Sequence, residues 1–313
     1  MLVLSRRCEA NVSSSTVFQG DLVLKGNNVT IIEGRFNING SIRVEENATL
    51  YLQNAVINFT QTSDFEQELI LCNPSKGNPR LIAENTSITS NHRNIVWFFD
   101  NSTGTLNNCI VTETLDAYDY SNVVVSGSTL KRLEVAGYSR VRLVDSKVVD
   151  DIFLSGYNEV FLVNSTFGWL FFDYWAPQIY VAWYLNVHVV DAYDENIPAA
   201  NVTATFQNGT VAEFQFTDDN GWVSFILLEK VVDPFGNHNI GNYTITATYG
   251  TYVEQESVNL NGNKEITLNL PFVIPEFPSA AISPLFIILT LFIAIFVKEF
   301  KIKTARLVCS LRS

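Results

Sequence analysis

The chain is short of cysteine, histidine and basic residues, and each shortage excludes a class of function. Its 313 residues include four cysteines and three histidines. They form neither a Cys-x-x-Cys motif nor a cysteine–histidine cluster, so we expect no metal site and no cofactor. Lys and Arg number 20 against 32 Asp and Glu, which gives a net charge of −12. Such an acidic body lacks the basic patches that bind nucleic acid, and this class of partner is excluded.

Short segments of alternating apolar and polar residues repeat along the first half of the chain. Residues 122–130, 140–148 and 159–167 align column by column, with apolar residues at alternate positions and small polar residues in the turn. A period of two inside each unit indicates strands. Tyrosines spaced 18, 19 and 17 residues apart mark the units: Tyr120, Tyr138, Tyr157 and Tyr174. A period near twenty is typical of a stacked solenoid.

These repeats predict an all-β fold whose body, residues 15–175, is a parallel β-solenoid of roughly seven or eight coils. Asn54, Asn85 and Asn108 fall in the turn column of earlier, looser copies. Asn and Gly tolerate the left-handed conformation of a sharp corner, and an Asn column also predicts hydrogen bonds along the stack. The pattern resembles that of right-handed β-helix proteins, which implies a right-handed coil. A β-sandwich of similar strands is the alternative.

The cysteines fit this repeat in two ways. Cys109 shares the small-residue column of Ser128 and Ser165, which predicts a buried free thiol. A disulfide between Cys72 and Cys109, on neighbouring coils, is the alternative.

A second domain follows over residues 185–271, where the repeat stops and strand and turn signals alternate. The expected strands are 185–191, 201–206, 212–216, 222–228, 243–249, 253–259 and 264–270. Residues 191–202 and the turn Thr217–Gly221 resemble the carboxypeptidase regulatory-like domain, which implies a small β-sandwich used as a spacer or adhesion module. The turn "TDDNG" lacks the spacing and distal Glu of a calcium loop, and a tight turn with Gly at positive φ is favoured over a metal site.

An aromatic segment, residues 176–184 with the residues before it, joins the two domains. Its aromatic rings, such as Trp169 and Trp183, predict a cap over the open end of the solenoid. Stacking on sugars is the alternative.

One long apolar run, residues 280–297, contains no charge and predicts a single transmembrane helix. Five basic residues follow it and none lies between Lys264 and Lys298. By the positive-inside rule, the tail 298–313 is cytoplasmic and the preceding domains are extracellular, on a single-pass protein of the cell membrane. The lipid bilayer is therefore an expected partner.

The residues before this run, 272–279, contain Pro275, Glu276, Phe277 and Pro278. They resemble the PEF-type C-terminal sorting signal of archaeal surface proteins, in which a Pro-Glu-Phe motif precedes an apolar helix and a basic end. The resemblance covers about 25 residues and implies an archaeal surface protein whose tail is a substrate for a membrane transpeptidase. The sixteen residues after the helix exceed the usual short basic cluster. A rigid Pro-rich spacer is the alternative.

Eleven Asn-x-Ser/Thr motifs agree with an extracellular location. The candidate glycosylation sites are Asn11, Asn28, Asn39, Asn47, Asn58, Asn85, Asn101, Asn164, Asn201, Asn208 and Asn242. Residues 1–14 stay unassigned, because they contain no apolar signal segment ahead of Arg6. We expect that the start codon is placed too late or that the chain is a fragment.

No catalytic residues are predicted. β-helix polysaccharide lyases and hydrolases use carboxylates stacked on successive coils. Here Glu134 shares its column with Phe153 and Phe171, so no acidic column is expected, and Asp150 and Asp151 are placed in a turn. We therefore expect a structural, adhesive or ligand-binding surface protein that is not an enzyme, with cell-envelope glycans or surface proteins as partners. The alternative is a surface-anchored β-helix polysaccharide lyase or hydrolase.

Overall fold

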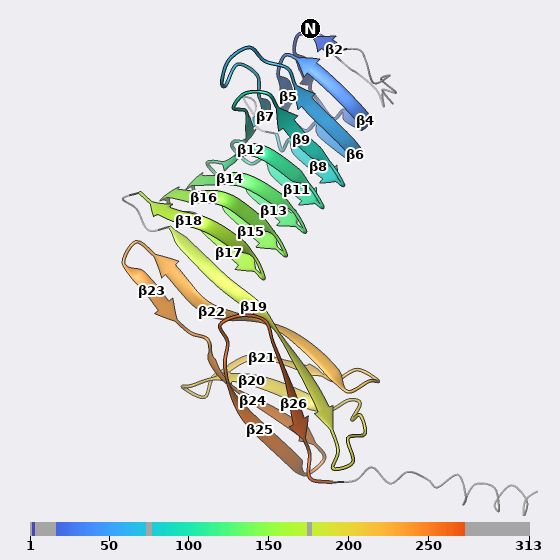
Figure 1. The fold of residues 1–313 in the computed structure, drawn as a ribbon, viewed down its shortest axis with the longest axis vertical. Coiled ribbons are helices and arrows are strands. Elements are labelled where there is room, and N and C mark those ends of the chain that lie inside the picture. Colours follow the sequence, from blue (N-terminus) through green and yellow to red (C-terminus); the bar gives the residue numbers. More distant parts are fainter. Residues whose placement is uncertain (1, 4–16, 73–76, 174–176, 273–313) are drawn as a thin grey trace, which may run out of the picture.

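The computed structural model describes residues 2–3, 17–72, 77–173 and 177–272, and every regular element among them is a β-strand (Figure 1). None of these residues forms a helix long and apolar enough to cross a bilayer. The expected transmembrane run 280–297, the motif Pro275–Pro278 and the tail 298–313 lie outside the described residues.

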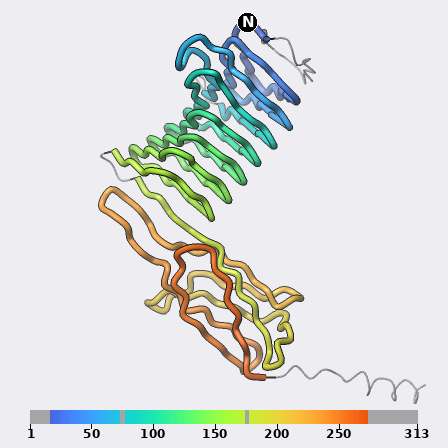
Figure 2. The backbone as a smooth tube through the Cα atoms, viewed as in Figure 1, coloured from blue at the N-terminus to red at the C-terminus, as the bar shows by residue number. Residues whose placement is uncertain are grey.

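The first part of the chain is a three-sided parallel β-solenoid of about eight turns, as the repeat predicted (Figure 2). Its three parallel ladders follow one another around each coil. Ladder 1 contains β3 (Leu22–Leu24), β5 (Ile42–Glu45), β7 (Leu69–Cys72), β10 (Ile95–Phe98) and the second halves of β12 (Ile110–Ala117), β14 (Thr129–Gly137), β16 (Lys147–Gly156) and β18 (Thr166–Phe172). The short β1 (Leu2–Val3) pairs with β3.

The other two ladders complete the coils. Ladder 2 contains the first halves of β4 (Val29–Asn39) and β6 (Thr49–Phe59), then β8 (Arg80–Glu84), β11 (Thr103–Asn107), β13 (Asn122–Ser126), β15 (Arg140–Val144), β17 (Glu159–Val163) and the first part of β19 (Gln178–Val190). Ladder 3 contains β2 (Val17–Gln19), β9 (Ser87–Ser90), the second halves of β4 and β6, and the first halves of β12, β14, β16 and β18. The right-handed sense of the coil stays a prediction.

The core of the solenoid consists of the alternate apolar residues that the repeat singled out. Val123, Val141 and Val160 pair in register and are almost fully buried, while Arg140 and Arg142 between them point to solvent. Burying these columns makes the main favourable contribution to the free energy of folding of the solenoid, because one coil alone has no apolar partner for its inner face.

Corner residues hold the stack together as expected. Asn85 donates from Nδ2 to Oδ1 of Asn54 at 3.1 Å, and Asn108 donates likewise to Asn85 at 3.3 Å. All three have positive φ. The next corner is Gly127, at φ 56°, where an added Cβ would lie 2.6 Å from Oδ1 of Asn108. The column therefore consists of hydrogen-bonded amides followed by a glycine, the one residue that leaves Asn108 room.

The second domain is a β-sandwich. One layer contains β26 (Lys264–Asn269), the second part of β19 and β22 (Trp222–Asp233). The other is a four-stranded antiparallel sheet in the order β21 (Val211–Phe216), β20 (Asn201–Phe206), β24 (Asn242–Tyr249) and β25 (Tyr252–Asn259). A separate cluster of buried apolar residues fills the space between them.

The join between the domains differs from the expected linker. Residues 178–182 of β19 form the eighth strand of ladder 2, and the same strand continues into the sandwich. Tyr184 donates its hydroxyl to Oδ2 of Asp145 at 3.2 Å, and Asn263 donates to Oδ1 of Asn164 at 2.8 Å. A strand cannot bend freely while both neighbours pair with it, so the two domains form one continuous body.

The cap over the solenoid is only partly the expected one: Phe167, Phe172 and Trp183 of the aromatic segment pack against the solenoid core. The hairpin of β22 and β23 (Gly236–Asn239) pairs antiparallel with β19, and Val232 joins the solenoid core. Trp183 packs against both cores and donates to Oε2 of Glu229 at 2.6 Å. Trp169, in contrast, is 75% exposed. The cap thus comes from both the aromatic segment and the second domain, and the second contribution is a long-range contact that local aromatic content does not reveal.

Two smaller predictions are settled. Cys72 and Cys109 are both free, so the alternative disulfide is wrong. Burial raises the pKa of both thiols. The "TDDNG" turn is a tight turn in which Oδ1 of Asp218 accepts from the backbone of Asn220 and Trp222, and Gly221 has φ 75°.

Candidate functional site

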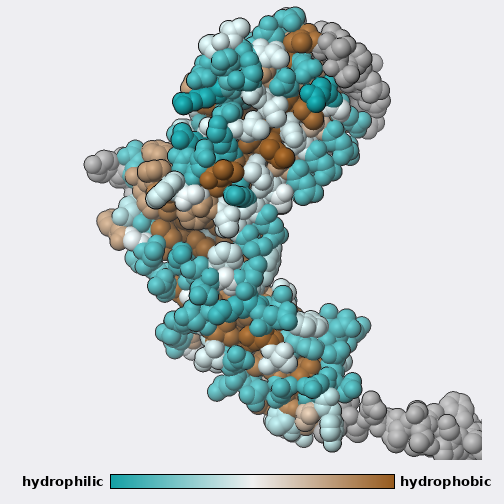
Figure 3. Space-filling model, viewed as in Figure 1, coloured by the Kyte–Doolittle hydropathy of each residue, from teal (hydrophilic) through white to brown (hydrophobic). Residues whose placement is uncertain are grey.

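The candidate site is the outer side of ladder 1, which we call the ladder-1 face. Its central column, in register across five coils, contains Trp97, Asp116, Glu134, Phe153 and Phe171. Neighbouring coils of a β-solenoid lie ~4.8 Å apart, so the two carboxyl groups are direct neighbours with aromatic rings on either side. Figure 3 shows pale and tan colours gathered near the ends of β16 and β18, between strongly polar surfaces.

Asp116 is the unusual member of this column. Its side chain is only 2% exposed, and its Oδ1 is buried without a hydrogen-bond partner among the described residues. Trp97 stacks on Phe99 with ring centroids 5.0 Å apart, and both rings contact Tyr118. Tyr118 donates its hydroxyl to Oε1 of Glu134. An aromatic trio therefore flanks the carboxyl pair.

This environment disfavours ionisation of Asp116. Burial, and then the neighbouring charge of Glu134, raise its pKa to about 8, whereas Arg132 acts in the opposite direction. Burial and the hydrogen bond to Glu134 also raise the pKa of Tyr118. Asp116 thus holds its proton to a higher pH than an ordinary carboxyl group, and a buried acid of this kind is enriched at functional sites.

A groove of about 180 Å³ lies beside the column, at the bulge between ladders 3 and 1. Its charged residues are largely paired. Arg132 donates from Nε to Oδ1 of Asp151 at 2.6 Å, and Lys131 lies 3.0 Å from Glu113. The groove is lined by Phe65, Arg93, Glu113, Thr114, Lys131, Arg132 and Asp150.

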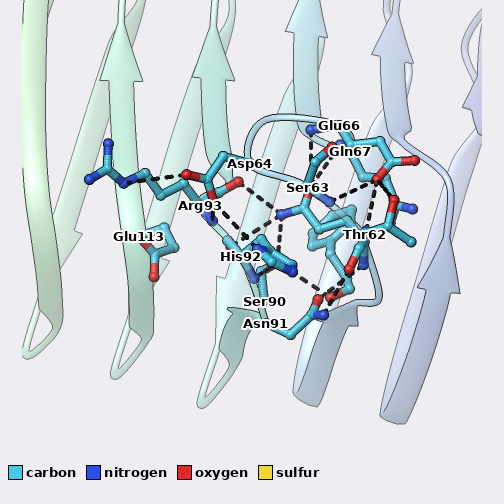
Figure 4. A network of polar contacts seen from close by, with 12 residues as sticks. Thr62, Ser63, Asp64, Glu66, Gln67, Ser90, Asn91, His92, Arg93 and Glu113 are labelled. Carbon is cyan, nitrogen blue, oxygen red and sulfur yellow. Dashed lines mark hydrogen bonds and ion pairs between the residues drawn. The ribbon is translucent and has the colours of Figure 1, made fainter.

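The loop that carries Phe65 is held by its own polar contacts (Figure 4). Gln61 is 3% exposed and donates from Nε2 to Oγ of Ser90 at 2.7 Å and to the carbonyl of Arg93 at 2.8 Å. Oε2 of Glu66 accepts from the backbone and hydroxyl of Thr62 at 2.8 Å. Phe65, at φ 61°, is 47% exposed. This loop therefore presents a fixed aromatic ring at the groove.

Exposed aromatic rings continue beyond the groove. Trp169 and Phe171 are 75% and 50% exposed, and Trp169 pairs in register with Asp151. At the following corner, Tyr138 stacks between Tyr120 and Tyr157 with centroid distances of 5.4 and 5.6 Å. Broad apolar rings interleaved with carboxylates and a guanidinium suit a ligand that has both flat apolar faces and hydroxyl groups.

The acidic pair corrects the expectation that no acidic column forms. Sequence alignment compared Glu134 only with the later coils, where Phe153 and Phe171 stand. In the preceding coil, β12 has one additional residue at a bulge between Val111 and Thr114, which shifts Asp116 into register with Glu134. Asp150 and Asp151 also lie inside β16 at such a bulge and not in a turn. Counting the additional residue at each bulge would have placed Asp116 beside Glu134.

The predicted glycosylation sites are spread over both domains. Six are exposed: Asn39, Asn47, Asn85, Asn101, Asn208 and Asn242. Four are half-buried: Asn28, Asn58, Asn164 and Asn201. Asn11 lies outside the described residues. No group of three or more His, Cys, Asp or Glu able to hold a metal ion occurs in the described part of the chain.

Comparisons with known proteins identify no family. No family model and no curated protein matches the chain. Among solved structures, the Bacillus anthracis TIE protein is 20% identical over 33% of this chain and 19% of its own, with a TM-score of 0.25. A DUF3823 family protein from Parabacteroides merdae is 18% identical over 29% of this chain and 46% of its own, with a TM-score of 0.22. This chain spans less than half the length of either, and these partial likenesses carry no argument about function.

Proposed function

We propose that the chain is a membrane-anchored extracellular surface protein that holds a ligand-binding solenoid away from the cell, without catalysis. The observation that supports this is the end of the molecule at which the chain leaves the sandwich. β19 leaves the solenoid and crosses the sandwich, and β26 runs parallel to it, so Phe272 lies at the end of the sandwich remote from the solenoid (Figure 1). The chain then leads into the Pro-rich spacer 272–279 and the apolar run 280–297, which we propose to be the anchor.

The residues on either side of the proposed anchor complete the proposed membrane topology. The sequence Pro275–Pro278 is proposed to be a PEF-type sorting signal of an archaeal surface protein. The tail 298–313 is proposed to be cytoplasmic, because its basic residues follow the apolar run.

We propose cell-envelope glycans of low charge as ligands of the ladder-1 face. Trp169 and Phe171 offer exposed ring faces, and Asp151 beside Trp169 offers a hydrogen-bond acceptor. A protein of net charge −12 repels polyanions, which favours a neutral saccharide.

A second function, a polysaccharide lyase or hydrolase, is favoured by one observation, the Asp116–Glu134 pair with its raised pKa. A general acid must reach the substrate within hydrogen-bond distance. Asp116 is only 2% exposed, so binding without catalysis is the stronger candidate.

Protease treatment of intact cells tests the location. We expect residues 17–272 to be released or degraded while a tail-directed antibody still detects residues 298–313 inside. A body that stays intact until the cells are lysed contradicts the proposal.

Binding of purified full-length chain in detergent to neutral and uronic-acid polysaccharides tests the role of the face. We expect Trp169→Ala to weaken retention on a neutral glycan, whereas Phe235→Ala, which removes an 89% exposed ring elsewhere, leaves it unchanged. Product release that disappears in Glu134→Gln would favour the enzyme instead.

A further inference from the structure

The outer side of the sandwich carries apolar rings where polar residues are expected. Phe214 and Phe216 on the edge strand β21 are 60% and 62% exposed. They pair in register with Thr203 and Asn201 of β20, whose intervening residue Val202 is fully buried. Both rings therefore lie on the solvent side, while Glu213 and Gln215, which pair with the buried Ala204 and Val202, point the other way. Large exposed rings on an edge strand attract other strands unless something covers them.

The residues opposite the two rings form an N-glycosylation motif. Asn201, Val202 and Thr203 read Asn-Val-Thr, and Asn201 faces Phe216 while Thr203 faces Phe214. On the other side, Thr248 and Thr246 of β24 pair with the same two residues and add hydroxyl groups to the surface. A saccharide attached at Asn201 thus emerges beside an exposed ring and above a row of hydroxyls.

Asn201 also differs from four other candidate sites in what its amide does. Four candidates donate a hydrogen bond from Nδ2, the atom that glycosylation modifies: Asn39, Asn58, Asn85 and Asn164. Asn208 accepts two hydrogen bonds from Thr210 within its own turn. The side chain of Asn201 has no hydrogen bond among the described residues, and its Oδ1 is buried without a partner. Its amide nitrogen is not committed to the fold.

We propose that Asn201 carries an N-linked saccharide whose first ring stacks on Phe216 and covers Phe214, shielding the edge of β21. The proposal rests on the extracellular location proposed above. The co-reactant is a polyprenyl-phosphate-linked or polyprenyl-diphosphate-linked saccharide. A bond forms between Nδ2 and the sugar C1, the bond from C1 to the phosphate oxygen breaks, and the phosphate leaves with the electron pair. Nδ2 loses one proton to a base of the transferase.

The stacked ring has two physical consequences. Sugar C–H groups against an aromatic face remove apolar surface from water, which stabilises the folded state. The saccharide also blocks the unpaired strand edge sterically, so another strand cannot add to it. The exposed rings Phe214 and Phe216 of β21 then form the surface on which the attached saccharide packs.

Two measurements on the full-length chain test this. Glycopeptide mass spectrometry of the chain from its native membranes maps which motifs are modified, and we expect Asn201 to be among them. Urea unfolding in detergent micelles then compares the wild type with Asn201→Gln, Phe216→Ser and the double variant. Loss of the saccharide should lower the folding equilibrium constant roughly three- to tenfold, the size of an aromatic contact, only when Phe216 is present.

Asn242→Gln is the matched control, because Asn242 lies in the same sheet opposite Asn259 and not opposite a ring. Its effect should be the same with Phe216 or Ser at that position. The inference is overturned if other motifs are modified while Asn201 is bare, or if Asn201→Gln has the same effect with Phe216 and with Ser at that position. Neither result affects the proposed extracellular location. If none of the motifs is modified, the inference is also overturned, and the protease test alone then decides the extracellular location. A chain from native membranes that is bare at Asn201 and dimerises through Phe216 assigns this face to a second copy instead and refutes the proposal.

Discussion

Replacing Asp116 with Asn tests whether the pKa of this buried residue of the ladder-1 face is raised. The folded state holds the Asp116 proton up to a pKa of about 8, whereas the ordinary carboxyl releases it near 3.8. Between these values the folded state binds more protons than the unfolded state, so the stability falls as the pH rises. The contribution is intact below the ordinary pKa and is lost by about pH 8.

The magnitude follows from linkage. One pKa unit corresponds to about 1.36 kcal/mol, so at pH 7 the buried acid costs the fold up to about 4 kcal/mol. A neutral amide of nearly the same shape carries no such cost. Asp116→Asn should therefore raise the free energy of unfolding by up to about 4 kcal/mol near pH 7 and by almost nothing near pH 4. This gain is a large fraction of the ~5–15 kcal/mol that stabilises a typical protein.

The assay is urea unfolding of the full-length chain in detergent micelles, followed by tryptophan fluorescence near pH 4, 5.5, 7 and 8.5. Trp97 stands beside Asp116 in register and reports on this region. A difference between variant and wild type that is constant across the pH range refutes the reasoning, as does destabilisation at pH 7. Leu162→Ala, which removes a buried apolar side chain in register with Leu143 and Val181, is the control and should show a pH-independent loss.

Three further predictions follow from the same structure. Glu134→Gln removes the neighbouring charge that raises the pKa of Asp116, so the decline in stability, which still begins near the ordinary pKa, should end at a lower pH and be smaller, as the same pH series measures. Gly127→Ala forces an L-residue to φ 56° and its Cβ against Asn108, which should cost at least 1–2 kcal/mol of unfolding free energy, whereas alanine at Gly209, with open space around it, should cost less. Leu143→Ala should cost roughly 2–5 kcal/mol because its side chain is fully buried between coils, and a smaller loss would mean that the core is loosely packed.

The regular coils were predictable because their side chains repeat without interruption. Val123, Val141 and Val160 stand at one position of three successive coils, and the structure stacks them in register. The Asn corner column was predictable for the same reason, since a positive φ is needed at each turn.

Features that depend on long-range pairing were not predictable. The bulge in β12 changes which residue of one coil meets Glu134 of the next, and no local pattern counts the residues of a bulge. Likewise β22, the first strand of the hairpin, pairs with residues of β19 that lie 34 (His188↔Trp222, 222 − 188) to 53 (Ile179↔Val232, 232 − 179) positions earlier in the chain. A strand such as β19 that serves two domains also hides the boundary, because its alternation continues unchanged through both.

Labelling of introduced cysteines on intact cells tests most directly that the rod stands outside the membrane and the tail inside. Asn101→Cys places a thiol on an exposed solenoid turn, and Ser310→Cys, in a chain with Cys309→Ser, places one in the tail. With an unaltered chain as background, a membrane-impermeant maleimide should label the first on intact cells and the second only after permeabilisation. Labelling of Ser310→Cys on intact cells, with Asn101→Cys protected, contradicts the account.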